Sequence, residues 1–175
     1  VATIIGIGFQ ARYQARCHVD LMSLNSLMIW ARDHKKAEVL MDDLADLNIT
    51  IKIRNDLEAL VKESQLIITA TSAKTPIIKS DWVQPGTHIT DVGSDTPEKC
   101  ELEPKLLAKA SIVVADSISQ NKLRGEIYQA LKENCLSVEN LIELGEVLEG
   151  TKLGRTGPNQ ITVADLTGVA IQDLV

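Results

Sequence analysis

Near the start of the chain, the residues best suited to a chemical role are the two glycines and the alanine of the run T-I-I-G-I-G-F-Q-A, residues 3–11. Gly6 and Gly8 follow a short apolar run, and Ala11 takes the third small position of a Gly-x-Gly-x-x-Ala pattern. Glycine lets the backbone approach a pyrophosphate closely, and the free N–H groups that open a helix favour its negative charge. Because ordinary glycine turns share this pattern, the prediction of a dinucleotide site rests also on the expected strand before it and helix after it.

The end of the second expected strand bears on which dinucleotide would bind. Such sites normally place Asp or Glu there, where the carboxylate accepts from the ribose 2′-hydroxyl. This chain has Ala31 followed by Arg32. The missing carboxylate removes repulsion toward a 2′-phosphate, and Arg32 could pair with one. The sequence therefore favours NADP(H) over NAD(H); the alternatives are that Arg32 is a solvated surface residue or that Asp33 contacts the hydroxyl.

A carboxylate follows a later strand, where the strand at residues 87–92 delivers Gly93, Ser94 and Asp95. In open α/β sheets, ligands lie outside the carboxyl ends of the strands. A carboxylate at that edge can reach a bound ligand and accept or return a proton at an ammonium group, which makes Asp95 a candidate catalytic residue. The alternative is that Asp95 caps the segment beginning at Thr96.

The elements that would position these residues alternate between strand and helix. The expected strands are residues 4–7, 27–30, 49–53, 66–68, 87–92 and 111–115, and the expected helices are residues 9–23, 35–47, 57–62 and 104–110. This alternation predicts an α/β fold of the Rossmann type, with a doubly wound, mostly parallel sheet flanked by helices.

Beyond residue 119 the pattern changes. We expect helices at residues 125–132 and 141–148, a glycine-rich loop at 150–159, a strand at 161–163 and a helix beginning at 167. Residues 1–175 are interpreted as one nucleotide-binding domain in which about 120–175 form a C-terminal extension. The chain opens on a buried strand and stops inside an apolar-periodic segment, so we expect it to be a fragment of a longer protein.

Composition excludes several classes of function. A net charge of −6 and five aromatic residues disfavour a nucleic-acid partner, because phosphate binding needs clustered Lys and Arg. No apolar run reaches membrane-spanning length, so we expect no membrane association. Three widely separated cysteines predict no disulfide framework and favour the cytoplasm, and three histidines without ligand spacing predict no metal site.

Several motifs together resemble one family, the ornithine cyclodeaminase/mu-crystallin family. They run through the whole chain in order: G-I-G-F-Q-A-R, W-V-Q-P-G-T-H-I-T-D-V-G-S-D-T-P-E-K-C-E-L at 82–102, G-E-I at 125–127, E-L-G-E-V-L-E-G at 143–150, G-R-T at 154–156 and T-V-A-D-L-T-G-V-A-I-Q-D at 162–173. The resemblance implies a Rossmann domain whose partner, an N-terminal substrate-binding and dimerisation domain, is not in this sequence. Family members draw an Arg and a Lys for the substrate carboxylate from that domain, so the chain alone would bind nucleotide without turnover, and the full-length protein would be a homodimer.

The resemblance also implies roles for individual positions. Asp95 would be the catalytic carboxylate. The cofactor side would comprise Gly6, Gly8, Phe9 and Gln10 near the pyrophosphate, Ala31 and Arg32 at the ribose, Thr71 and Lys99 along the cofactor, and Ile89, Thr90, Asp91 and Val92 beneath the nicotinamide. Many relatives carry a serine that contacts the cofactor where this chain has Leu166, so Leu166 is placed at the cofactor but can only pack.

The resemblance implies a reaction on a small amino or imino acid. In the cyclodeaminase, Asp95 would assist proton transfer at the amino group while hydride leaves Cα for NAD⁺; the side-chain amine attacks the imine, ammonia departs and hydride returns. Ketimine reduction and alanine-dehydrogenase-like oxidation are alternatives, and so is a non-catalytic binder that holds a ligand beside NADPH, as mu-crystallin holds a hormone. The form D-L-T-G at 165–168 is closer to ectoine-utilisation members, whose substrates are other diamino or cyclic imino acids.

Overall fold

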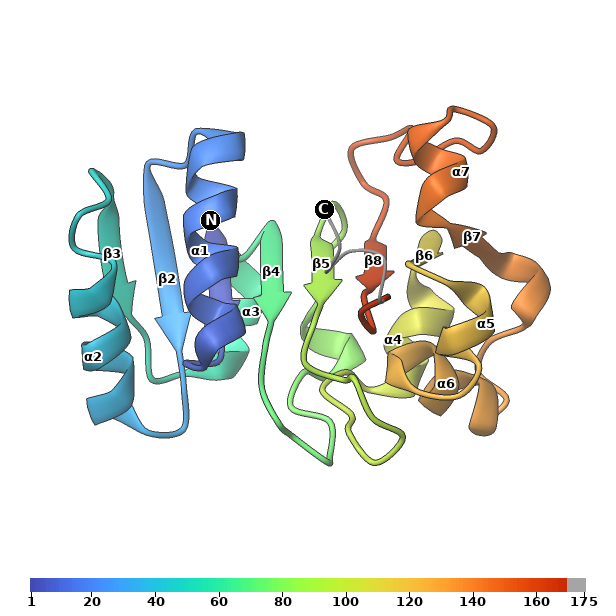
Figure 1. Ribbon diagram of the computed structural model, residues 1–175, viewed down its shortest axis with the longest axis horizontal. Coiled ribbons are helices and arrows are strands. Elements are labelled where there is room, and N and C mark those ends of the chain that lie inside the picture. Colours follow the sequence, from blue (N-terminus) through green and yellow to red (C-terminus); the bar gives the residue numbers. More distant parts are fainter. Residues whose placement is uncertain (170–175) are drawn as a thin grey trace.

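Eight short strands pair in parallel into one sheet in the computed structural model, which describes residues 1–169 (Figure 1). They are β1 Ala2–Ile5, β2 Ser26–Trp30, β3 Thr50–Ile53, β4 Leu66–Thr69, β5 His88–Asp91, β6 Ile112–Ala115, β7 Leu141–Glu143 and β8 Thr162–Asp165. The strand order is β3-β2-β1-β4-β5-β8-β6-β7. The chain leaves β1 in one direction and returns to pair β4 on its other side, so a crevice is expected between the carboxyl ends of β1 and β4.

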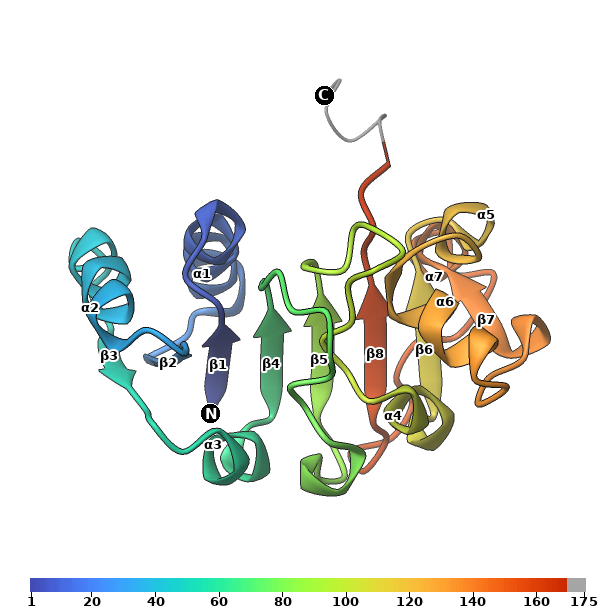
Figure 2. The ribbon, with the colours of Figure 1, turned by 90° about the horizontal axis from the view of Figure 1, so that it is seen from below.

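Helices cover both faces of the sheet (Figure 2). One face carries α1 Phe9–Met22 and α2 His34–Asp43, and the opposite face carries α3 Leu57–Glu63 and α4 Pro104–Lys109. Toward β6 and β7 lie α5 Ile118–Asn121, α6 Gly125–Lys132 and α7 Leu144–Leu148; two 3₁₀ turns span Ser80–Trp82 and Val138–Asn140. Every residue of β1 and β4 is buried, as expected of parallel strands covered on both sides.

The core consists of two apolar clusters that share the strands between them. Ile4 of β1 belongs to a cluster with Ala11 of α1, whereas the next residue, Ile5, belongs to a cluster with Val61 of α3 and Leu106 of α4. Successive strand residues point to opposite faces, so neighbouring isoleucines serve different layers. No helix within residues 1–169 is both long and apolar enough to cross a bilayer.

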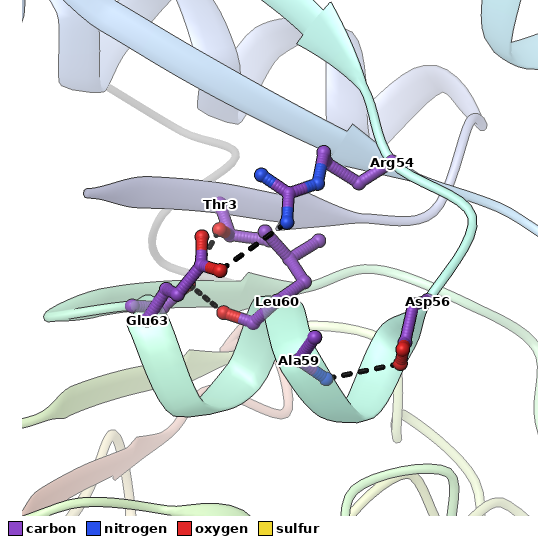
Figure 3. A network of polar contacts seen from close by, with 7 residues as sticks. Thr3, Arg54, Asp56, Ala59, Leu60 and Glu63 are labelled. Atoms are coloured by element: carbon purple, nitrogen blue, oxygen red, sulfur yellow. Dashed lines mark hydrogen bonds and ion pairs between the residues drawn. The ribbon is translucent and has the colours of Figure 1, made fainter.

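Side-chain hydrogen bonds fix α3 against β1 (Figure 3). Asp56 caps the helix by accepting from the backbone N–H of Ala59 at 3.0 Å. At the other end, the Ser64 hydroxyl donates to the carbonyl oxygen of Leu60 and shares a hydrogen bond with the Thr3 hydroxyl, both at 2.7 Å. A helix of seven residues is marginal alone, so these contacts help to hold it in place beneath the first strand.

The expected order of strands and helices up to residue 115 is confirmed, while some details are wrong. The helix expected at 35–47 ends at Asp43, and Leu44 begins a series of turns. The helix expected at 141–148 begins at Leu144, because the three residues before it pair with β6 as β7. Apolar residues in so short a segment suit a strand and a first helical turn equally well. Residues 167–169 are not helical, and the rest of the helix expected there lies outside the described residues.

The late part of the chain contributes a central strand. β8 lies between β5 and β6 and pairs with both in parallel. The strand expected at 161–163 is therefore present, shifted to Thr162–Asp165. The packing of residues 120–175 toward a further domain stays a prediction.

Candidate functional site

A cavity of about 520 Å³ opens at the carboxyl ends of β1, β2, β4 and β5. Its walls come from residues 6–10, 30–33, 36, 70–73, 77, 92, 93, 95 and 99. The cavity therefore lies at the point where the strand order reverses, the usual ligand position in open α/β sheets. Its volume falls in the range of about 300–1,000 Å³ found for small-molecule sites.

The glycine turn forms one wall of this cavity. Gly6 has a φ of 125°, and a Cβ there would lie 2.4 Å from the carbonyl oxygen of Ala70. Gly8 precedes α1, and a Cβ there would meet nothing within 4 Å. Among the described residues, no side chain caps the first turn of α1. Its N–H groups are thus free to bind an anion that approaches Gly8.

The far end of the cavity, at the start of α2, carries two cations. Arg32 and Lys36 are exposed and line the cavity, and Ala31 ends the segment after β2 without a carboxylate. Asp33 caps α2: its carboxylate accepts from the backbone N–H of Lys36 at 3.2 Å and lies 3.9 Å from the Lys36 ammonium. Among the residues that line this end of the cavity, the carboxylate of Asp33 is thus already hydrogen-bonded to the first turn of α2. This arrangement suits an anionic group.

The Asp95 loop, residues 93–102, forms the opposite wall. Lys99 donates from Nζ to Oδ1 of Asp95 at 2.5 Å, and both side chains line the cavity. The Asp95 side chain is 54% exposed, so it remains accessible to a ligand. The segment after it is a turn closed by the Lys99 N–H and the Thr96 carbonyl oxygen, rather than a helix. The geometry therefore gives Asp95 no helix to cap.

Ten of the fourteen residues predicted for the site line this one cavity: Gly6, Gly8, Phe9, Gln10, Ala31, Arg32, Thr71, Val92, Asp95 and Lys99. The other four do not. Ile89 is fully buried in the core, and Thr90 is buried beside His88. Asp91 is buried at the end of β5, where its carbonyl oxygen accepts from the N–H of Leu166. Contact of these four with a cofactor stays a prediction.

Sequence reasoning missed Lys36 and three buried acids near the cavity wall. Lys36 lies in the first turn of the helix that follows the second strand, and a cation at that position could have been predicted from the sequence to line the cavity. Nothing local marks Glu101, Glu126 and Asp165, which join the predicted Asp91 in a group of acids that are at most 1% exposed and come from separate segments. Within residues 1–169, no group of three or more His, Cys, Asp or Glu side chains is placed to hold a metal ion.

The buried acids bind backbone and hydroxyl groups in and next to the segment 70–73 that lines the cavity. Glu101 accepts from the N–H of Thr71 at 2.7 Å, and Asp91 accepts from the Thr69 hydroxyl at 2.6 Å. Among the described residues, Asp91, Glu101 and Asp165 each keep one carboxyl oxygen without a hydrogen-bond partner. On Asp91 and Asp165, such an oxygen is a place where a protonated carboxyl could carry its hydrogen.

Burial raises the pKa of three of these acids. The pKa of Asp165 rises to about 8 and that of Glu126 to about 7, with hydrogen bonds from backbone N–H groups opposing the rise. The pKa of Asp91 is raised well above its ordinary value by burial and then by the negative charges of Glu126 and Glu101. Protons therefore remain on these buried acids near neutral pH.

We expect the free energy of unfolding to fall as the pH rises from 6.5 to about 8. The folded chain keeps protons on Asp165 and Glu126 up to pKa values of about 8 and about 7, whereas the unfolded chain loses them near pH 4. The folded state binds more protons here, so stability declines by up to about 1.4 kcal/mol per pH unit for each proton. Urea unfolding at several pH values measures the slope.

The window begins at 6.5 because His88 opposes the trend below its ordinary pKa; burial lowers the pKa of His88 to about 4. Asp165→Asn should flatten the slope, because it removes one of the buried protons. Asp81→Asn, at an exposed carboxyl, should keep the slope unchanged. A free energy of unfolding that does not fall over this window would show that the buried acids are ionised in the folded chain.

Comparison with known proteins gives consistent matches over the whole chain. The family model of the ornithine cyclodeaminase/mu-crystallin family matches residues 1–175. An uncharacterized cyclodeaminase of Sinorhizobium fredii is 39% identical over 175 residues, which are 99% of this chain and 53% of the relative. The chain spans about half the length of the curated relatives it matches.

Two solved structures resemble the fold closely. An archaeal alanine dehydrogenase dimer with bound NAD has a TM-score of 0.91 and 32% identity, over 99% of this chain and 54% of that chain. The Delta(1)-pyrroline-2-carboxylate reductase of Thermococcus litoralis, in complex with NADH and L-proline, has a TM-score of 0.91 and 28% identity, over 98% of this chain and 54% of that chain. The likeness therefore extends over the whole sheet.

Proposed function

The chain belongs to the ornithine cyclodeaminase/mu-crystallin family, and from that premise we propose that it is the pyridine-nucleotide half of an enzyme acting on a small amino or imino acid. The observation that carries the proposal is one cavity shared by the Gly6–Gly8 turn and the Asp95–Lys99 pair. Hydride transfer at Cα requires the residues that bind the cofactor's phosphates and the residue that exchanges a proton with the substrate to lie in the same cavity. Relatives that act on alanine, or that bind NADH and proline, support this reaction class.

The residues present fit a dinucleotide. We propose that Gly6, Gly8, Phe9 and Gln10 lie at its pyrophosphate, where the open space beside Gly8 and the uncapped start of α1 favour an anion. Ala31 and Arg32 would lie at the ribose, and Thr71, Val92 and Lys99 along the nicotinamide side. When bound, the dinucleotide supplies the acceptor or donor of hydride.

Asp95 would handle the proton at the substrate nitrogen. Its Oδ1 is held by the Lys99 ammonium, which leaves Oδ2 to accept a proton from a substrate ammonium or to return it. Lys99 would thereby orient the carboxylate as well as face the cofactor. Such a pairing of a carboxylate and a cation at the reacting centre serves either direction of a reversible amine oxidation.

We also propose a second, substrate-binding half in the full-length protein, through which two copies form a homodimer. The chain spans about half of its relatives, and one solved relative is a dimer. In this arrangement residues 120–175 pack toward that half, and the substrate carboxylate is bound there. The three free cysteines suit a reducing, cytoplasmic location.

We propose that NADP(H) is preferred over NAD(H), because Arg32 and Lys36 line the cavity beside Ala31, the position where NAD sites usually carry a carboxylate, and Asp33 is engaged by α2. Titrating NADPH and NADH into the protein tests both the nucleotide site and this preference. Arg32→Ala should weaken NADPH binding about 10- to 100-fold, the worth of a charge-assisted phosphate contact, and leave NADH within about threefold.

Lys35→Ala is the matched control, since Lys35 is an exposed cation on α2 that does not line the cavity. The two solved relatives described above hold NAD or NADH, so both dinucleotides are titrated in parallel. Equal affinities with an ineffective Arg32→Ala would contradict the preference alone. Failure of the protein to bind either dinucleotide would contradict the nucleotide site itself.

A further inference from the structure

The first turn of α6 holds both ends of the Asp95 loop. Glu126 is 1% exposed, and its carboxylate accepts from the Ser94 hydroxyl at the start of the loop. The same carboxylate accepts from the backbone N–H groups of Glu101 at 2.6 Å and Leu102 at 3.0 Å, at the loop's end. One buried side chain thus joins the two ends of a loop whose middle carries Asp95.

The middle of the loop is held by the next residue on the same face of α6. Gln129 lies three positions after Glu126, so the two side chains point the same way from the helix. The Gln129 amide donates to the carbonyl oxygens of Pro97 at 2.7 Å and Lys99 at 3.3 Å. The turn between Asp95 and Lys99 is therefore attached to α6 as well.

The start of α6 is fixed to the central strand β8. Asp165 accepts from the N–H of Ile127 at 2.7 Å, and so acts as a cap for the helix. Gly125 has a φ of 90°, and a Cβ there would lie 2.7 Å from Oδ2 of Asp165. The helix that holds the loop is thus anchored to the sheet at the point where Glu126 leaves it.

We infer that Glu126 is a positioning residue that sets where Asp95 and Lys99 stand in the cavity, through the hydrogen bonds it accepts from Ser94, Glu101 and Leu102. The inference rests on the function proposed above for Asp95. The inferred role does not require Glu126 to touch the cofactor or the substrate, because Glu126 does not line the cavity. A displacement of about 1 Å at a reacting group can cost about 10²-fold in rate. A residue that fixes the position of the loop can therefore affect turnover without touching the substrate.

Glu126→Gln in the full-length protein tests this directly. The comparison is made at pH 8, where Glu126 is ionised because its pKa is about 7. There the amide keeps the shape of the side chain but turns one acceptor into a donor that faces an N–H or O–H group. We expect kcat to fall about 10- to 100-fold with the dinucleotide Kd within about threefold. In an Asp95→Asn background, Glu126→Gln should cost less than about twofold more, because the two changes remove the same function.

Glu133→Gln, at the exposed end of α6, is the control for loss of a carboxylate and should leave kcat unchanged. Ser94→Ala removes only the hydrogen bond between Glu126 and the start of the loop, and it replaces Glu126→Gln in the test if that variant does not fold. Its expected loss in kcat is about 3- to 10-fold. Additive losses in the double variant, or an unchanged kcat in Glu126→Gln and Ser94→Ala, would overturn the inference.

Amide hydrogen exchange of residues 94–102 separates this inference from the proposed function, because it needs no dinucleotide or substrate. Glu126→Gln should speed exchange there by at least about tenfold while β1 and β4 stay protected. Unchanged exchange in the loop would overturn the role of Glu126 even if the wild-type protein is an active enzyme. Conversely, a wild-type protein that binds no dinucleotide contradicts the proposed function, whatever the loop's exchange.

Discussion

Replacing Asp95 by Asn in the full-length protein is expected to lower kcat about 10³-fold and to leave the Kd of the dinucleotide within about threefold, as for loss of a general acid–base group. The amide has the same shape as the carboxylate but cannot take a proton from an ammonium group. Its pairing with Lys99 also weakens, because a neutral oxygen replaces a charged one. Steady-state turnover and a separate binding titration measure the two quantities.

Glu98→Gln is the control for Asp95→Asn, since Glu98 lies in the same loop, is exposed and does not line the cavity. It should leave kcat unchanged. Nearly full turnover in Asp95→Asn would contradict the catalytic role. A wild-type protein that binds both dinucleotide and amino acid without turnover would instead be a carrier, and Asp95→Asn would then leave ligand binding intact.

Gly6→Ala is expected to lower the free energy of unfolding by about 2–4 kcal/mol, from a strained φ and a close contact together. The φ of 125° at Gly6 is one that alanine rarely adopts, and its Cβ would lie 2.4 Å from the Ala70 carbonyl oxygen and 2.8 Å from that carbonyl carbon. The obstacle is backbone, so β1 and β4 would have to separate where the cavity begins. Chemical denaturation measures the loss.

Gly8→Ala makes the matched comparison two residues later. Gly8 has a φ of −78° and open space where the Cβ would stand, so Gly8→Ala should lower the free energy of unfolding by no more than about 1 kcal/mol, the cost of alanine at a helix N-cap. The added methyl group would occupy the space through which an anion approaches α1, and we expect dinucleotide affinity to fall at least about tenfold. Equal stability losses in the two variants would contradict the close approach at Gly6.

Much of the fold follows from patterns that are local in the sequence. A short buried apolar run is enough to indicate β1 and β4. An aspartate at the N-cap, followed by apolar residues at helical spacing, indicates the start of α2 and of α3. The glycine turn and Asp95 could be assigned to one edge of the sheet because parallel strands all end there. That inference placed both in the cavity that the structure shows.

The remaining features depend on partners that are distant in the sequence. Leu141–Glu143 became a strand only because β6 offers a free edge, which no local pattern records. The role of Glu126 depends on a loop more than twenty residues before it, and its burial depends on both segments packing together. Glutamate in a helix's first turn usually faces water, so its type alone gave no sign of this.

The placement of β8 has a consequence for synthesis of the protein. β5 and β6 lie next to each other in sequence but are joined only through β8, whose residues 162–165 come late in the chain. While a ribosome is still making the glycine-rich segment before them, both strands expose unpaired edges that can recruit other nascent chains. Premature termination in that segment would therefore favour aggregation over a smaller soluble product.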